Sequence, residues 1–262
     1  MRFREIILER MEISWVRPWI ESAVSKIGSY KNDLDWFRKF FKNLNSSDEL
    51  KKWKEENISH PVIIKPRLLE RPDLSYAVLN AAHQIEDPLH HQITVEVNVA
   101  QAPSDQTKTK SFIDRLSSVL IHELNHTHQR DQQLKKAKDP DDIFDIETSV
   151  WKKTPPTPLT KRDEYYIYML DHMEKDAWIS QIASEIHNVL GEDSIKYLNS
   201  ILKQAQTQEY ATVKNRIINV PNLKLLYDAL NYYGRFLKIT KEAAWQRVKK
   251  ELYGYLSRYD GK

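Results

Sequence analysis

Hydrophobic residues in the first 58 positions recur at steps of three and four, which is the spacing of amphipathic helices. This spacing predicts helices over residues 15–27 and 34–41. The polar break at residues 45–48 predicts a capped start for a third helix over residues 49–55. The segment offers no candidate catalytic group, and we expect the aromatic side chains at residues 36–41 to pack in the core.

The pattern changes after residue 58. Residues 61–64 and 68–69 are typical of short extended segments, and residues 75–83 suggest a helix. Residues 93–99 alternate strictly between apolar and polar, which predicts a half-buried strand. The apolar members of this strand share its buried side, and its polar members face solvent or a cleft.

A polar loop at residues 101–110 leads into a predicted helix over residues 111–132, and the apolar residues of this helix form one stripe on a helical wheel. Glu123 falls inside the stripe, and His122 and His126 lie at its edge. An unpaired carboxylate in an apolar stripe is costly, so Glu123 needs a cation, a metal ion or a hydrogen-bond donor nearby.

A second carboxylate occupies the same kind of position in a predicted helix over residues 163–190. Glu174 lies on the wheel within about 60° of an apolar stripe that includes Ala177 and Trp178. One cation that meets both Glu123 and Glu174 would explain both positions. The alternative is that Glu174 pairs with an arginine or lysine in the helical core.

His122, Glu123 and His126 form the pattern His-Glu-x-x-His. Residues four apart on a helix differ by about 40° around its axis, so the two imidazoles can share one metal ion. Glu123 points about 100° away from His122, which suits a base rather than a third ligand. Imidazole ligands at this spacing favour Zn²⁺, and Glu174 can supply an oxygen ligand. The alternative is two surface histidines beside a salt-bridged glutamate.

Other histidines fit this metal site poorly. His128 projects about 240° from His122, and His172 projects about 160° from Glu174. We interpret His90 and His91 as loop residues before the predicted strand rather than as ligands.

The remaining pattern predicts an α+β protein that is predominantly helical. Residues 135–161, rich in acidic residues and proline, form an irregular insertion that can gate a neighbouring cleft. The chain is helical again from residue 191 to its end. We therefore expect an N-terminal helical segment (1–58), a central core (59–190) and a C-terminal helical segment (191–262).

Composition narrows the function classes. The chain of 262 residues has 40 Lys and Arg against 37 Asp and Glu, which gives a formal charge of +3. This small excess of positive charge does not indicate a nucleic-acid-binding surface. The absence of cysteine excludes disulfides and thiolate ligands. Neither a run of about 18 apolar residues nor a secretory signal is present, so we expect no membrane segment and a cytoplasmic location, in the producing cell or an infected host.

Residues 122–126 resemble the active-site helix of the zincin metallopeptidases. Residues 93–99 resemble the edge strand along which those enzymes lay their substrate, and residues 174–177 resemble the glutamate-ligand helix of the gluzincin branch. The resemblance covers roughly residues 90–190 and implies a zincin-like core with a small sheet. The size of the chain and the lack of a signal look like small intracellular or phage-encoded metallopeptidases.

The sequence departs from the gluzincin pattern at two points. Thermolysin-like enzymes carry an aspartate four residues after the glutamate ligand, where this chain has Trp178. Asp171 or Asp176 can orient a ligating histidine instead. The distance between His126 and Glu174 is also longer, which the insertion explains.

The resemblance implies a zinc-dependent metallopeptidase that hydrolyses a protein or peptide substrate. His122, His126 and Glu174 would hold Zn²⁺, which lowers the pKa of water to about 7, and Glu123 would act as general base. Candidates by residue type for the oxyanion donor are Tyr165, Tyr166, Tyr168 and His187, and Tyr166 lies nearest the face of Glu174.

The rival hypothesis is a non-catalytic, regulatory or virion-associated interaction protein with a structural or vestigial zinc site. A structural site closes with a fourth protein ligand, such as His172 or Asp171, whereas a catalytic site keeps one position open.

Overall fold

The computed structural model of the chain describes residues 13–28, 32–87, 90–136, 172–207, 220–233 and 241–259. The predicted N-terminal helices are present as α1 (Val16–Ser25), α2 (Asp33–Asn45) and α3 (Asp48–Asn57). The predicted cap of α3 is confirmed, because the Ser47 side chain accepts a hydrogen bond from the backbone N–H of Leu50.

The aromatic residues of α2 pack in the core as predicted. Trp36, Phe37 and Phe40 are nearly fully buried, and all three contact the ring of Phe112 at centroid distances of 5.1–6.0 Å. Phe112 belongs to the long helix α4 (Gln106–Lys136). These contacts therefore fix the N-terminal helices against the element that carries the histidines.

The sheet has three strands, β1 (Val62–Leu69), β2 (Val78–Asp87) and β3 (His90–Asn98), in the order β1-β3-β2. β1 runs parallel to β3, and β2 runs antiparallel to it. The helix expected over residues 75–83 is therefore wrong, because most of that segment belongs to β2. Pairing with β3 and burial of Val78 and Ala81 outweigh the weak helical signal of the local sequence.

The predicted strand 93–99 is present but lies in the centre of the sheet, so the expectation of an edge strand there is wrong. β2 is instead the edge strand that packs against α4. The loop expected at His90 and His91 is also wrong. Both residues begin β3, since pairing with β2 and β1 extends the strand toward its N-terminus.

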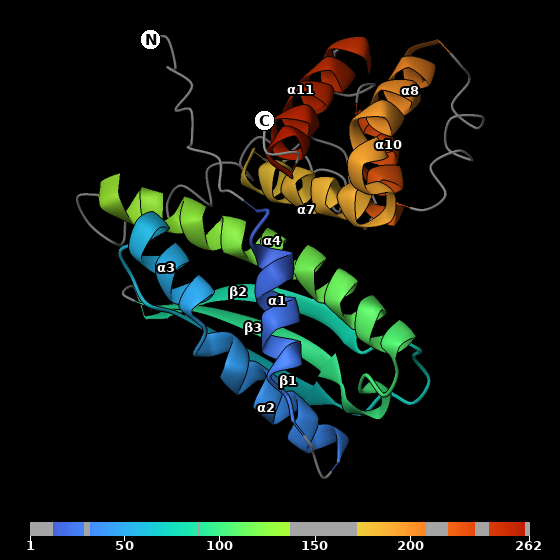
Figure 1. The fold of residues 1–262 in the computed structure, drawn as a ribbon. Coiled ribbons are helices and arrows are strands. Elements are labelled where there is room, and N and C mark those ends of the chain that lie inside the picture. The colour runs from blue at the N-terminus through green and yellow to red at the C-terminus, as the bar shows by residue number, and fades with distance from the viewer. Residues whose placement is uncertain are drawn as a thin grey trace, which may run out of the picture.

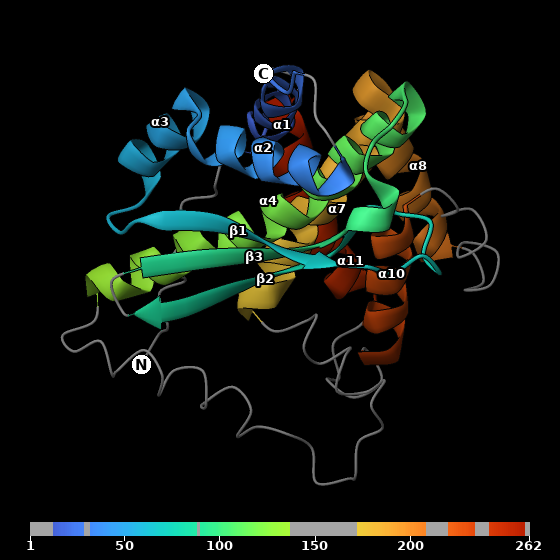
Figure 2. The ribbon, with the colours of Figure 1, turned by 90° about the horizontal axis from the view of Figure 1, so that it is seen from below.

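α4 starts earlier than predicted, because Asp105 caps it by accepting a hydrogen bond at 2.8 Å from the backbone N–H of Lys108. The loop expected at residues 101–110 is therefore helical from Gln106 onward. α4 packs on β2 and β3, α2 packs on β1, and α1 fills the space between α2 and α4 (Figures 1 and 2).

The helix α7 (His172–Leu190) packs on the side of α4 that faces away from the sheet (Figure 1). It ends at Gly191, whose φ of 54° suits a residue without Cβ. In the part of the C-terminal region that the structure describes, α7 is followed by α8 (Ser194–Thr207), α10 (Pro221–Tyr233) and α11 (Lys241–Tyr259).

Val248, Leu252, Tyr255 and Leu256 of α11 are buried, and one continuous cluster of buried hydrophobic side chains extends from Ile13 to Leu256. The molecule is thus mostly helical with a small sheet. None of the helices in the described part of the chain has the length and apolarity needed to cross a membrane. Most of the predicted insertion 135–161 lies outside the described residues, and the division into three segments stays a prediction.

Glu185 joins three helices through one carboxylate oxygen. Its Oε1 accepts hydrogen bonds from Ser118 on α4 at 2.7 Å, from Gln181 on α7 at 3.2 Å and from Asn222 on α10. Burial, the largest cause, raises the pKa of Glu185 even though these donors lower it.

This raised pKa predicts the pH dependence of stability. The folded protein binds the Glu185 proton more tightly than the unfolded chain does. The contribution of Glu185 to the free energy of unfolding is therefore fully present at low pH, and it declines as pH rises from the ordinary glutamate pKa through the raised value. Glu185→Gln keeps an accepting oxygen and removes the charge. We expect it to raise the free energy of unfolding near pH 7 and to flatten its decline with pH, as measured by denaturant titration at several pH values. A variant that is less stable than wild type at pH 7 would contradict the interpretation.

Candidate metal centre

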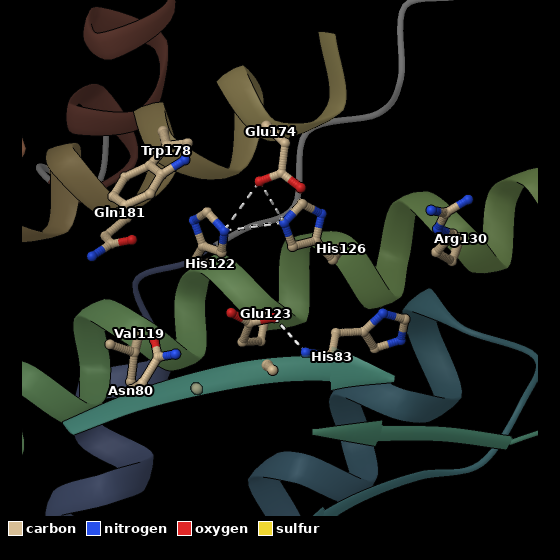
Figure 3. Close-up of a pocket in the computed structure, with 12 residues that line it drawn as sticks. Asn80, His83, Val119, His122, Glu123, His126, Arg130, Glu174, Trp178 and Gln181 are labelled. Atoms are coloured by element: carbon tan, nitrogen blue, oxygen red, sulfur yellow. Dashed lines mark hydrogen bonds and ion pairs between the residues drawn. The ribbon is translucent and has the colours of Figure 1, made fainter. Parts of the chain in front are cut away.

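The two histidines of the His-Glu-x-x-His pattern meet on one face of α4. The Nε2 atoms of His122 and His126 lie 3.1 Å apart, and both rings are largely buried (Figure 3). This arrangement follows from local geometry, because residues four apart on a helix stack on the same side.

Glu174, in the first turn of α7, completes a group of three. Its Oε2 lies 3.6 Å from Nε2 of His122 and 3.3 Å from Nε2 of His126 (Figure 3). A tetrahedral ion with bonds of about 2.0–2.1 Å spaces neighbouring ligand atoms about 3.3–3.4 Å apart. The three observed separations lie within about 0.3 Å of this value, so the donor set is compatible with an ion of this kind.

Two atoms of the group lack hydrogen bonds within the described residues. Oε2 of Glu174 and Nδ1 of His122 are both buried and have no hydrogen-bond partner there. The carboxylate oxygen faces two imidazole nitrogens, and at most one proton can lie between those nitrogens. A bound cation satisfies the oxygen and both Nε2 atoms together.

The electrostatics of the group follow from its burial and its close pairing. Burial tends to raise the pKa of Glu174, but the two imidazoles outweigh it and lower that pKa to about 2. Burial tends to lower the pKa of His126, and the neighbouring carboxylate of Glu174 outweighs it, so this pKa is raised. The carboxylate is therefore ionised and attracts positive charge to this point.

Trp178 occupies the position at which the gluzincin pattern has an aspartate. Its indole packs against the imidazole of His122 in a T-shaped arrangement, with ring centroids 4.9 Å apart. The orientation of His122 is thus fixed by ring packing, whereas a carboxylate would fix it by a hydrogen bond.

Glu123 is buried and points from α4 toward β2 (Figure 3). Its Oε2 accepts a hydrogen bond at 2.7 Å from the backbone N–H of His83. The hydrogen-bond donor that we expected near the Glu123 carboxylate is therefore a backbone N–H of the edge strand β2. This bond occupies one carboxylate oxygen and leaves Oε1 as the oxygen that can accept a proton from a ligand.

These side chains border a cavity of about 540 Å³ between α4, α7 and β2. β2 contributes residues 80–83. α4 contributes the two histidines of the metal group together with Glu123 and Arg130, and α7 contributes Glu174, Trp178 and Gln181. The cavity is large enough for several residues of a peptide or for a small organic molecule.

A second layer of hydrogen bonds ties α11 to the metal group. The Tyr255 hydroxyl donates to Oδ1 of Asp176 at 3.2 Å, and Asn125, inside the His-Glu-x-x-His pattern, reaches Tyr255 and Ser180. Gln129 donates to Oδ2 of Asp176 at 3.4 Å and also interacts with His126. Asp176 therefore supports His126 through Gln129, and this network rigidifies the group.

The other sequence candidates have varied positions. Tyr166 and the neighbouring tyrosines lie outside the described residues, as does Asp171, and the side chain of His172 is not described. His128 is buried on α4 and does not line the cavity. His187 lies 13 residues beyond Glu174 on α7, about 20 Å along the axis, which excludes it as an oxyanion donor at this site.

Sequence analysis missed His83, Arg130 and Gln181 as cavity residues. His83 was hidden by the wrong helix assignment of residues 75–83. Arg130 lies four residues after His126, so the helical period alone places it on the same face. Nothing in the sequence around Gln181 distinguishes it from an ordinary polar residue of a helix.

The chain was also compared with known proteins. A scan against family models, a search of curated proteins and a search of solved structures each found no match. The zincin resemblance therefore stays an expectation from the sequence.

We predict that Glu174→Ala weakens Zn²⁺ binding at this group by at least about 100-fold, because it removes the only charged ligand of the three. Chelator competition on the metal-stripped full chain measures the affinity. The matched control is Glu192→Ala, which removes an exposed carboxylate just after α7 and leaves the affinity unchanged. Equal affinities in the two variants would remove Glu174 from the metal centre.

We predict that Tyr255→Phe lowers the free energy of unfolding by about 1–2 kcal/mol, since Asn125 and Asp176 lose a buried hydrogen-bond partner. Tyr253→Phe is the control, because that ring lies on the same helix and is 45% exposed. Denaturant titration gives both values. A loss of stability in the control as large as that in Tyr255→Phe would refute a specific role for the buried hydroxyl.

Proposed function

We propose that the chain is a metal-dependent hydrolase of peptide bonds, with His122, His126 and Glu174 as ligands and Zn²⁺ as the ion. The observation that carries the proposal is the triangle of two Nε2 atoms and Oε2, with sides of 3.1–3.6 Å, at the wall of an accessible cavity. A Zn²⁺ ion bound there acidifies water and polarises a carbonyl group.

Glu123 is the proposed general base. It lies next to His122 on α4, lines the same cavity and keeps Oε1 available while Oε2 is held by the backbone N–H of His83. Anchoring one oxygen fixes the direction of the other, and this preorganisation is what proton transfer at a defined atom requires.

β2 supports the choice of an extended peptide as substrate. Within the described residues β2 pairs on one side only, with β3, and residues 80–83 of its backbone border the cavity. An extended peptide can add to such an edge through main-chain groups other than the N–H of His83, which already donates to Glu123, and this would place a peptide bond beside the metal group. We therefore propose β2, and not residues 93–99, as the edge strand along which the substrate binds.

Stabilisation of the developing oxyanion needs a donor near the ion. Tyr166 remains the candidate from sequence. Among the described residues, Arg130 lines the cavity one helical turn beyond His126 and carries a permanent positive charge.

The decisive experiment is Glu123→Gln in the zinc-loaded full chain. Gln keeps an oxygen that can accept from the His83 N–H, so we expect the fold and the metal content to persist while cleavage of a peptide library falls about 10²–10⁴-fold. Mass spectrometry of the products measures cleavage, and Glu55→Gln, with an exposed carboxylate on α3, serves as control. Full activity of Glu123→Gln would exclude Glu123 as the base.

A further inference from the structure

A second group of metal-binding side chains lies outside the site described above. His60 comes from the connection between α3 and β1, His91 from β3 and Asp131 from α4, and one potential ligand atom of each lies within 4.8 Å of the others. Three elements that are distant in sequence thus converge on one point. His91 and Asp131 are nearly fully buried.

Within the described part of the chain, one ring nitrogen of His91 is paired and the other is not. Its Nδ1 lies 2.9 Å from Nε2 of His83, so the two imidazoles share a hydrogen bond. Its Nε2 is buried and has no hydrogen-bond partner among the described residues. Leaving such an atom unsatisfied is unfavourable, and a ligand at this point would remove the penalty.

The state of His91 also suits a metal ligand. Burial, the largest cause, lowers its pKa to about 4 against the opposing effect of Asp131, so the ring is neutral at physiological pH. The hydrogen bond between Nδ1 and His83 is the kind of support that a ligating imidazole commonly has from a neighbour.

Asp131 and His60 supply the other donors. Oδ1 of Asp131 lies 2.7 Å from Nδ1 of His60 and accepts from the backbone N–H of Ser59 at 2.9 Å. An ion bound between Oδ1 of Asp131 and Nδ1 of His60 requires these two atoms to move apart by about 0.6–0.7 Å, to the spacing of about 3.3–3.4 Å around a tetrahedral ion.

We propose that His60, His91 and Asp131 form a second divalent-metal site that fixes β3 and the α3–β1 connection to α4. Two imidazoles and one carboxylate favour a borderline ion such as Zn²⁺ over Ca²⁺ or Mg²⁺, which prefer oxygen ligands. The proposal does not depend on the proposed hydrolytic function.

The surrounding charges set the relative affinity of this site. Nζ of Lys135 lies 2.9 Å from Oδ2 of Asp131, and the charge of Arg130 also acts on His91. Arg130 borders both groups, but Lys135 contacts only Asp131 and opposes a divalent ion there, so we expect this site to bind more weakly than the group at Glu174. Asp131 lies five residues beyond His126, about 7.5 Å further along α4, which is too far for a two-metal site with ions about 3.5–4 Å apart.

Metal stoichiometry of the full chain tests the proposal. Metal-stripped protein is dialysed against Zn²⁺, and bound zinc is measured by mass spectrometry. We expect two ions per chain in wild type, one in the double variant His122→Ala, His126→Ala, and one in His60→Ala. His60 is the least buried of the three ligands, and circular dichroism verifies that its variant is folded.

Lys135→Gln provides a second measurement that does not remove a ligand. It replaces an exposed cation that holds Oδ2 of Asp131, so we expect at least about fivefold tighter binding of the weaker ion and no change for the tighter one. A double variant that binds no zinc, or an unchanged weaker affinity in Lys135→Gln, would overturn the second site. One ion in both wild type and the double variant would instead support it and refute the group at Glu174.

Discussion

The buried carboxylate of Glu174 facing two imidazole nitrogens is the interaction on which the rest of the site depends. Removing a charge from water is unfavourable unless an opposite charge meets it, and the two Nε2 atoms lie close enough to hold a cation beside that oxygen. The pairing of α4 with α7 brings these side chains together, and the cavity then opens toward β2.

α4 carries residues of both candidate metal groups in the described part of the chain. It carries His122, Glu123 and His126 at its middle and Asp131 one to two turns later, so both candidate metal groups share one rigid rod. His83 links them on the sheet side, because its backbone N–H holds Glu123 and its ring contacts His91. A structural ion in the second group would therefore also stabilise the strand that supports Glu123.

On the side of α4 that faces away from the sheet, the C-terminal helices support the metal group. Tyr255 reaches Asn125 and Asp176 from α11, and Asn222 reaches Glu185 from α10. Polar side chains at helix–helix contacts specify one relative position when all of their partners are present. The helices that carry no candidate catalytic residues thus help to position α7, and with it Glu174, against α4.

The sequence by itself determined the features that depend on one helix at a time. The four-residue spacing of His122 and His126 fixes their common face, and the placement of Glu174 in an apolar stripe predicted a cation partner. The α+β class and the capped N-terminal helices followed from local patterns of the same kind.

Only the tertiary structure decided which strand forms the edge and which histidines meet. β2 is a strand because it pairs with β3, and His60, His91 and Asp131 come together only when a loop, a strand and a helix pack. Such contacts depend on residues distant in the chain, so local periodicity does not encode them.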